Sequence, residues 1–261
     1  MTQTEWKSFT NFRDEYKELC KKWSASYVNL SDLQREASLK DTPPYPIENS
    51  IVYNTDYDKI TENDDIRLIV IGDNPGKEEQ LNKNQRYLVG QSGRIAEGFF
   101  RRNPELKTDF RKNAIIVNKT PVHTAKTAHL KYLAKNNADA ATLILESQNE
   151  IARLTAELHK ALDAELWIVG YAELKGRGVF IPYRDTLLNC YKEDSGVMND
   201  AWNKVFLYQH FSMNRFIVDL KNFSEAQKNK DKTLSENLKE IGGKSNEKNS
   251  GKKEVIIIII T

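Results

Sequence analysis

Four short apolar runs, each closed by polar or turn-forming residues, dominate the hydrophobic pattern of this chain. They cover residues 66–71, 113–118, 166–169 and 205–209. Uninterrupted apolar runs of this length that are rich in β-branched residues are typical of strands buried on both faces, as in a parallel sheet. We therefore predict a central, mostly parallel four-stranded sheet.

The segments around these runs carry apolar residues at steps of three and four, which is the period of an amphipathic helix. The clearest case is residues 5–23, where one face carries Trp6, Phe9, Phe12, Tyr16, Leu19 and Trp23. We predict this segment to be a helix packed on the domain. A second, short helix is expected at residues 29–39, with Ser31 as its N-cap.

Further helical segments are expected between and after the strands. One covers residues 94–102, with Ser92 or Gly93 as the residue that starts it. The others cover residues 127–162, 200–204 and 214–223. Residues 171–199, which precede the short helix at 200–204, are expected to be irregular. Helices that alternate with strands predict an α/β fold, with helices on both faces of the sheet in a three-layer sandwich.

Polar clusters close three of the predicted strands. GDNPG follows the first strand at residues 72–76, NKTP ends the second at 118–121, and HFSMNR follows the fourth at 210–215. The carboxyl ends of parallel strands lie along one edge of a sheet, and ligands bind outside that edge. The sequence therefore predicts that these clusters converge on a single site.

The GDNPG cluster has the composition of a rigid elbow. Asn74 precedes a proline, which biases it towards an extended backbone, and the two glycines allow backbone geometry that a side chain would forbid. The elbow presents the Asp73 carboxylate and the Asn74 carboxamide. Because the same residue types form ordinary turns, the convergence of several clusters, and not this motif alone, indicates a functional site.

Charge is unevenly distributed along the 261 residues, although the formal net charge is only +2. Residues 1–80 hold 10 basic and 16 acidic groups, whereas residues 81–135 hold 12 basic and 3 acidic groups, a local charge of +9. A positive surface of this kind is what a polyanion such as DNA contacts. A solvated face without a ligand is the alternative that charge alone leaves open.

Composition narrows the class of protein further. Charged residues make up 29% of the chain, and no apolar run approaches the roughly 20 residues of a membrane span. The N-terminus lacks a secretory pattern, and the two cysteines, Cys20 and Cys190, have no metal-binding spacing. We therefore expect a cytoplasmic monomer that does not bind a membrane and contains no metal or cofactor.

Residues 1–224 are predicted to form the α/β domain, with residues 1–45 as an N-terminal helical extension. Residues 225–261 are rich in Lys, Asn, Ser, Glu and Gly, a composition typical of a disordered charged tail. A brief helix is expected within this tail at residues 234–241. The isoleucine run at 256–260 is too short to span a membrane and is interpreted as low-complexity sequence or a contact to a partner.

Four motifs, in order, resemble those of the uracil-DNA glycosylase superfamily over residues 68–216. GDNPG is similar to the G-x-N-P-G of the thymine-DNA and single-strand-selective branches and to the G-E-A-P-G of the iron–sulfur branch. RYLVGQSGR at residues 86–94 is similar to the R-P-F-V-G-R-S/A-G of the latter branch. VNKTP places Asn118 where the superfamily has an Asn after its second strand, and HFSMNR matches the H-P-S-P motif at His210 and Ser212.

The resemblance implies a DNA glycosylase that hydrolyses the bond between deoxyribose and uracil or another deaminated base. In this interpretation Asn74 positions the attacking water, and Asp73 orients water or a neighbouring group. His210 donates a hydrogen bond to the leaving base, on which negative charge develops. Asn118 reads the edge of the base, since its amide offers both a donor and an acceptor.

The same resemblance implies contacts to the base stack and to DNA. Leu88 aligns with a stacking Phe of the iron–sulfur branch, and the adjacent Tyr87 would stack only if the register shifts. DNA contacts are expected from Gly90, Gln91, Ser92, Gly93, Arg94, Lys119, Ser212, Met213, Asn214 and Arg215. Met213 is the candidate for an apolar wedge inserted between bases.

Departures from the family motifs keep other hypotheses open. Leu88 replaces the stacking Phe, Phe211 stands where the late motif has Pro, and the cysteines of the iron–sulfur branch are absent. A catalytically silent protein that binds nucleic acid or a free nucleobase in the same cleft is therefore the alternative. A small-molecule hydrolase on the same fold is a third hypothesis, because fold does not fix substrate.

Overall fold

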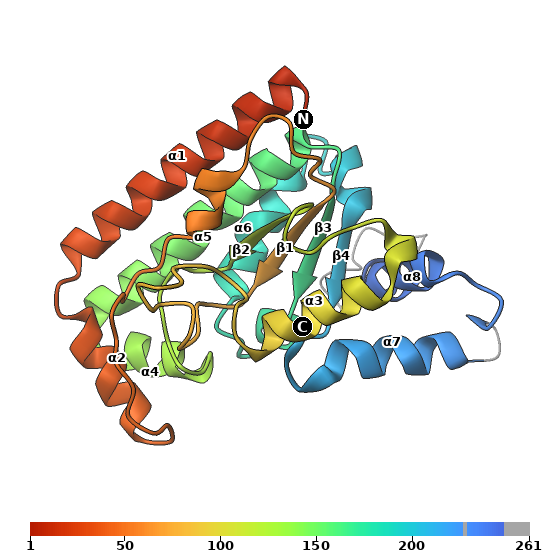
Figure 1. Ribbon diagram of the computed structural model, residues 1–261. Coiled ribbons are helices and arrows are strands. Elements are labelled where there is room, and N and C mark those ends of the chain that lie inside the picture. Colours follow the sequence, from red (N-terminus) through yellow and green to blue (C-terminus); the bar gives the residue numbers. More distant parts are fainter. Residues whose placement is uncertain (227–228, 248–261) are drawn as a thin grey trace.

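A parallel sheet lies at the centre of the computed structural model, which describes residues 1–226 and 229–247 (Figure 1). Its strands are β1 (Leu68–Gly72), β2 (Ala114–Asn118), β3 (Glu165–Val169) and β4 (Val205–Tyr208), in the spatial order β2-β1-β3-β4. All neighbouring strands are parallel, which confirms the predicted sheet. The register pairs Gly72 with Asn118 and Val169 with Tyr208, so the carboxyl ends of the strands lie level along one edge.

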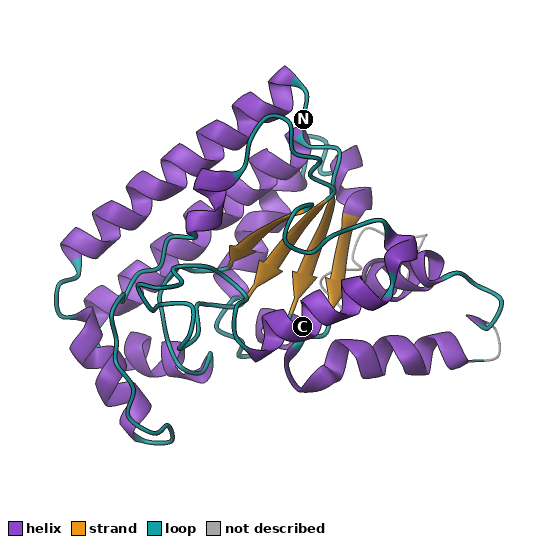
Figure 2. Ribbon diagram, viewed as in Figure 1, coloured by secondary structure: helices purple, strands orange, loops and turns teal. Residues whose placement is uncertain are grey.

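Helices cover both faces of the sheet, as Figure 2 shows. They are α1 (Gln3–Ser26), α2 (Leu30–Leu39), α3 (Gln91–Arg102), α4 (Ala128–Asn136), α5 (Ala138–Ala161), α6 (Ile181–Tyr191), α7 (Arg215–Glu225) and α8 (Leu234–Glu247). The α/β fold with helical layers on both sides confirms the predicted three-layer sandwich. Within the described part of the chain, no helix is long and apolar enough to cross a membrane.

Side chains of the sheet alternate between the two helical layers. Trp167 of β3 contacts Phe100 of α3, with ring centroids 5.6 Å apart, and Tyr208 of β4 contacts Phe216 of α7 at 5.4 Å. Ile168, the next residue of β3, lies on the opposite face, against α6. Because helices cover both faces, every residue of β1 and of β2 is buried, which is the environment that their uninterrupted apolar sequences predict.

The N-terminal helix confirms the amphipathic pattern of residues 5–23. It begins with a capping box, in which the Thr2 hydroxyl and the Glu5 carboxylate each accept the other's backbone N–H. Its buried face carries Phe9, Phe12, Tyr16, Cys20 and Trp23. The helix lies along α5, so the predicted N-terminal extension packs onto the helical layer of the domain.

Several predicted helix boundaries are wrong, each for a local reason. Asn29, and not Ser31, is the N-cap of α2, and Ser31 lies inside that helix. Helix α3 begins at Gln91, before the predicted start. The long helical segment predicted after the second strand is two helices, because the Asn137 side chain accepts the backbone N–H of Ala140 and starts a new helix there.

Helix α6 lies in the stretch that the sequence analysis expected to be irregular. Glycines at 170, 176 and 178 interrupt the pattern just upstream, and Pro182 adds a further break signal. In the structure Pro182 occupies the first turn of α6, where its missing N–H is not needed. Tyr183, Leu187 and Tyr191 are spaced four apart and are buried, so the helical signal was present and was masked by the glycines. The short helix expected at residues 200–204 is a 3₁₀ helix.

Ordered structure extends past residue 224, the expected end of the domain. Helix α8 is longer than the brief helix expected at residues 234–241, and it packs on β4. The Tyr208 hydroxyl donates a hydrogen bond to the backbone oxygen of Leu238 at 3.0 Å, and a Cβ on Gly242 would lie 2.7 Å from the Tyr208 ring. The isoleucine run at 256–260 lies outside the described residues.

Candidate functional site at the carboxyl edge of the sheet

The structure brings the polar clusters predicted at the strand ends together at one edge. Asp73 and Asn74 directly follow β1, Asn118 ends β2 with Lys119 after it, and His210 follows β4. Gly72 and Asn118 are paired across the sheet, so the first two clusters are neighbours. The site is therefore assembled by strand order, because three separate chain segments supply residues to the same edge.

An ion pair lies in the middle of this edge. The Lys119 ammonium is fully buried, and its Nζ lies 2.6 Å from Asp73 Oδ1. Nζ also donates to the backbone oxygens of Gly72 at 3.3 Å and Val169 at 2.8 Å. Burial lowers the pKa of Lys119, and the Asp73 carboxylate opposes this shift. Lys119 was expected to contact DNA. Its side chain instead lies inside the molecule, paired with Asp73.

The Asn118 side chain is buried with half of its amide unused. It is 1% exposed, and its Nδ2 has no hydrogen-bond partner among the described residues. Its Oδ1 lies over Gly72, where a Cβ would be only 2.4 Å away. A buried donor without an acceptor costs free energy, and this amide is one of the unsatisfied polar groups of the described residues.

The Asn74 side chain is oriented by Thr124. Its Nδ2 donates to Thr124 Oγ1 at 2.8 Å and to the backbone oxygen of Thr124 at 3.3 Å. The backbone N–H of Thr124 in turn donates to the Pro75 oxygen at 3.1 Å, so the two loops hold each other. Because the donor end of the Asn74 amide is engaged, its oxygen is the end that can accept a hydrogen bond from water.

The protonation of His210 is fixed by Ser212. Its Nδ1 accepts the backbone N–H of Ser212 at 3.1 Å and lies 2.8 Å from the Ser212 hydroxyl. Burial lowers the pKa of His210, Asp73 opposes the shift, and Lys119 adds to it. The imidazole is therefore neutral at neutral pH with its proton on Nε2, where it is a hydrogen-bond donor.

The loop before α3 places Leu88, and not Tyr87, at the site. The nearest Leu88 carbon would lie 3.8 Å from a Cβ on Gly72, the same point that the Asn118 oxygen approaches. Tyr87 is fully buried in the core, where its hydroxyl contacts the Tyr16 hydroxyl at 2.6 Å and the Val52 oxygen at 2.5 Å. The resemblance had left both residues as base contacts, and the geometry keeps one of them beside Asn118.

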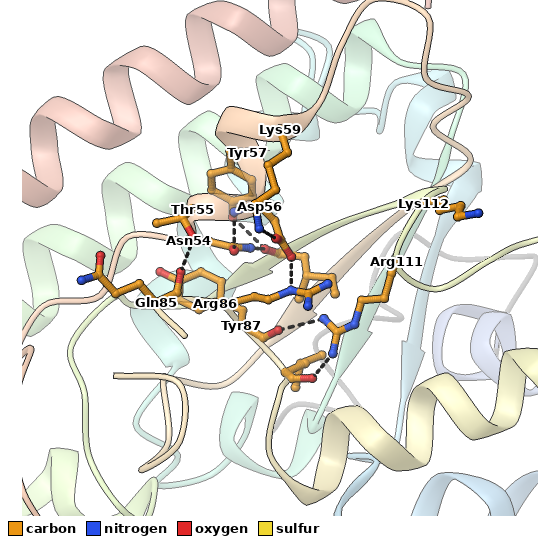
Figure 3. Close-up of polar contacts among 12 residues, drawn as sticks. Asn54, Thr55, Asp56, Tyr57, Lys59, Gln85, Arg86, Tyr87, Arg111 and Lys112 are labelled. Atoms are coloured by element: carbon orange, nitrogen blue, oxygen red, sulfur yellow. Dashed lines mark hydrogen bonds and ion pairs between the residues drawn. The ribbon is translucent and has the colours of Figure 1, made fainter. Parts of the chain in front are cut away.

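Arg111 and the ion pair of Arg86 anchor this loop, as Figure 3 shows. The Arg111 guanidinium donates to the backbone oxygen of Tyr87 at 3.1 Å and to that of Leu88. Arg86 pairs with Asp56. Leu88 has a positive φ of 51°, an unusual conformation for a residue with a side chain, so these contacts hold the loop against a local backbone cost.

The residues expected to contact DNA form a rim beside the site, with the exception of Lys119. The 3₁₀ turn Ser212–Asn214 packs against α3, which brings the late motif next to the segment 90–94. Gln91, Arg94, Asn214 and Arg215 are exposed, and Ser92 and Ser212 are half-buried. Gly90 is half-buried before α3, and Gly93 is buried where a Cβ would collide with the Leu88 oxygen.

Met213 stands at the tip of this rim. It is 71% exposed, which is unusual for a large apolar side chain, and its φ is 55°. Asn214 follows with a φ of 56°, so two consecutive residues adopt the left-handed conformation. A strained turn that presents one apolar side chain to solvent is suited to contact a partner surface.

Sequence reasoning missed three residues that shape the site. Thr124 orients Asn74, Arg111 holds the Leu88 loop, and buried Glu79 accepts the backbone N–H of Gly76 at 2.9 Å. Burial raises the pKa of Glu79 to about 7. Thr124 and Glu79 lie within a few residues of the motifs, so their nearness to the clusters was a usable signal, whereas Arg111 carried none.

The chain matches no protein-family model, and no curated protein is significantly similar to it. The geometry of the carboxyl edge is therefore the basis on which a function is assigned. Among the described residues, no group of three or more His, Cys, Asp or Glu side chains is arranged to bind a metal ion.

Proposed function

We propose that the protein is a DNA glycosylase that hydrolyses the N-glycosidic bond of uracil or another deaminated base. The observation that carries this proposal is the buried, unpartnered Nδ2 of Asn118 beside Leu88 and Gly72. A base carbonyl is an acceptor of suitable size for that donor, and Leu88 offers the base an apolar contact. The motif resemblance and the rim of exposed basic residues beside the site agree with this substrate class.

The site groups fit the charges that develop in this reaction. When the bond from C1′ to the base nitrogen breaks, the bonding pair leaves with the base and positive charge grows on the sugar. His210 donates from Nε2 to a carbonyl oxygen of the departing base, and Asn118 donates from Nδ2 to the base edge. The base is stabilised as an anion by two donors that need no reorganisation.

Water completes the reaction on the sugar. The Asn74 oxygen accepts a hydrogen bond from the water and directs its lone pair towards C1′. The new C1′–O bond forms as the bond to the base breaks, and the proton lost by the water ends on the base after exchange with solvent. The Asp73 carboxylate supplies negative charge at the end of β1, where it offsets the positive charge on the sugar.

The rim residues can contact DNA from which one base has been unstacked. Unstacking a base costs a few kcal/mol. Met213 is exposed on the strained turn and can fill the gap, while Arg94 and Arg215 are exposed for contact with phosphates. The proposed DNA contact is therefore a wedge of one apolar side chain between two basic positions.

One observation favours a second candidate, a catalytically silent protein that binds nucleic acid or a free nucleobase. The Asp73 carboxylate is paired with Lys119 at 2.6 Å, so its charge is already neutralised before a ligand arrives. A site of this kind retains the Asn118 and His210 donors for a base and loses part of the stabilisation of the sugar cation. Both candidates use the same residues at the carboxyl edge and are separated by whether base is released.

Base release from defined oligonucleotides tests the proposal. Single- and double-stranded DNA carrying uracil, hypoxanthine, xanthine or a mismatched thymine is incubated with the protein, and free base is quantified. Release from at least one substrate, dependent on Asn118 in an Asn118→Ala comparison, is the expected result. Absence of release together with DNA binding that weakens with salt supports the silent binder. Weak DNA affinity that barely changes with salt supports a small-molecule hydrolase.

A further inference from the structure

Lys119 joins three strand ends from inside the molecule. Its backbone N–H donates to the oxygens of Gly72 and Asp73, at 3.1 and 3.0 Å, which fixes the end of β2 against the end of β1. The side chain then reaches β3, where Nζ donates to Val169. No solvent reaches this side chain, since its exposed fraction is 0%.

The surroundings of Nζ identify Lys119 as a charged ammonium. Its three N–H donors meet three acceptors, namely the Gly72 oxygen, Asp73 Oδ1 and the Val169 oxygen. The ring of Phe180 adds a further favourable contact, with Nζ 5.1 Å from its centroid. A neutral amine has one donor fewer and would leave a buried acceptor unpaired. An ammonium with all donors engaged has no lone pair with which to attack a sugar.

The Asp73 carboxylate is confined from its other side by Gly170. This glycine has a φ of 84°, and a Cβ at this position would lie 2.8 Å from Asp73 Oδ1 and 3.2 Å from Oδ2. The carboxylate therefore occupies space that only a glycine leaves open. Lys119 from β2 and Gly170 after β3 hold Asp73 in one orientation, in which it is 15% exposed to solvent.

We propose that Lys119 is a positioning residue, which holds the Asp73 carboxylate at the end of β1 through the buried ion pair and acts on the reaction mainly through Asp73. This inference rests on the proposed function for its catalytic consequence, although the ion pair and its geometry do not. Asp73 faces Lys119 from β2, Gly170 after β3 and His210 after β4, so the pair also sets the charge that His210 experiences.

A double-mutant cycle tests whether Lys119 acts through Asp73. We expect Lys119→Met to lower kcat for base release on the order of 100-fold, because the carboxylate is no longer held in place, with a much smaller change in KM. Adding Lys119→Met to Asp73→Asn is expected to cause no further loss. The matched control is Lys17→Met, which removes a partly exposed lysine paired with Asp58 far along the chain and is expected to leave kcat unchanged.

Two kinetic outcomes overturn the inference. If the losses from Lys119→Met and Asp73→Asn multiply, the two residues act independently. If KM rises while kcat is unchanged, Lys119 contributes to DNA binding instead. Borohydride trapping adds a third: an imine between Nζ and the C1′ aldehyde of the abasic site, formed with loss of water and reduced by hydride, would identify Lys119 as a nucleophile.

Titration of His210 by NMR tests the same ion pair without reference to activity. Removing the positive charge in Lys119→Met is expected to raise the pKa of His210, and removing the negative charge in Asp73→Asn is expected to lower it. Shifts of opposite sign support the inference even if no base is released, in which case the proposed function alone fails. Unchanged titration in both variants overturns the inference.

Each single replacement leaves one buried charge unpaired, which is strongly destabilising. The double variant Lys119→Met/Asp73→Asn removes both charges together and is therefore expected to be more stable to unfolding than either single variant. A double variant whose stability is lowered by the sum of the two single effects would show that the residues are not coupled, and would overturn the inference where a single variant fails to fold.

Discussion

The two edges of the central sheet differ in how their polar groups are satisfied. At the carboxyl edge, a lysine and an asparagine are almost completely buried, and the Nδ2 of Asn118 has no acceptor within the described part of the chain. At the amino edge, a cleft of about 460 Å³ opens between β1, β3, β4 and α8. Two ion pairs line this cleft and are partly exposed, namely Glu165 with Lys239 at 3.5 Å and Asp163 with Lys204.

The comparison separates the size of a hollow from the strain and burial of the polar groups beside it. The amino-edge cleft is lined by ion pairs that are partly exposed. The carboxyl edge contains features that lower stability: a buried ion pair, positive φ values at Leu88 and Met213, and the Asn118 Nδ2, which has no acceptor among the described residues. Costs of this kind are concentrated at functional sites, which is why the function is assigned to that edge.

Two buried histidines, one near each edge, should each lower the stability of the protein in acid. His123, behind the elbow, contacts the Pro75 oxygen, and His159, at the amino edge, contacts the Ala164 oxygen. Burial lowers the pKa of each to about 4. The unfolded chain takes up these protons near pH 6.5, so their stabilisation is complete above that pH and is lost as pH falls towards 4, by about 3 kcal/mol for each residue.

Urea unfolding between pH 7.5 and 4 measures this effect. His123→Gln and His159→Gln should each flatten the dependence of unfolding free energy on pH, and each should do so by itself because the residues lie at opposite edges. A pH dependence that neither variant changes would show that these histidines are not the groups responsible.

Replacement of Gly72 should disturb the carboxyl edge specifically. A Cβ in Gly72→Ala would lie 2.4 Å from Asn118 Oδ1 and would push the amide away from the base. We expect base release to fall by about 10- to 100-fold, since small misplacements of positioning groups carry such costs. Gly76→Ala is the matched control, because its Cβ meets nothing within 4 Å. Equal effects of the two replacements would mean that Asn118 is not placed by contact with residue 72.

The smallest effect is expected at the amino edge. Lys239→Met removes the ion pair with Glu165, and both side chains of this pair are partly exposed. Such pairs contribute less than about 1 kcal/mol, so the unfolding midpoint should move little and base release should stay at the rate of the unchanged protein. A large loss of base release in this variant would show that the amino edge contributes to the reaction.

The fold was predictable because its signals are local. The four apolar runs became the four strands, and the strand ends carried the polar clusters to one edge. Helix α6 was missed although Tyr183, Leu187 and Tyr191 have helical spacing, since the glycines before it dominate the pattern. The candidate site residues Asp73, Asn74, Asn118 and His210 could be placed together from the sequence because each lies at or within two residues of the end of a strand.

The remaining details of the site depend on contacts between distant segments. Asn118 and Lys119 are consecutive polar residues, and the sequence does not tell that the lysine is buried against Asp73. The choice between Tyr87 and Leu88 is decided by the positive φ of Leu88 and by Arg111, more than 20 residues away. These are properties of packing, for which a single sequence contains no periodic signal.

Single-turnover release of base from the substrate found in the oligonucleotide panel tests the central claim most directly. His210→Ala at the carboxyl edge is compared with Glu165→Gln at the amino edge under identical conditions. We predict a loss on the order of 100-fold or more for His210→Ala and an unchanged rate for Glu165→Gln. Full activity of His210→Ala, or equal losses in the two variants, would contradict the assignment of the reaction to the carboxyl edge.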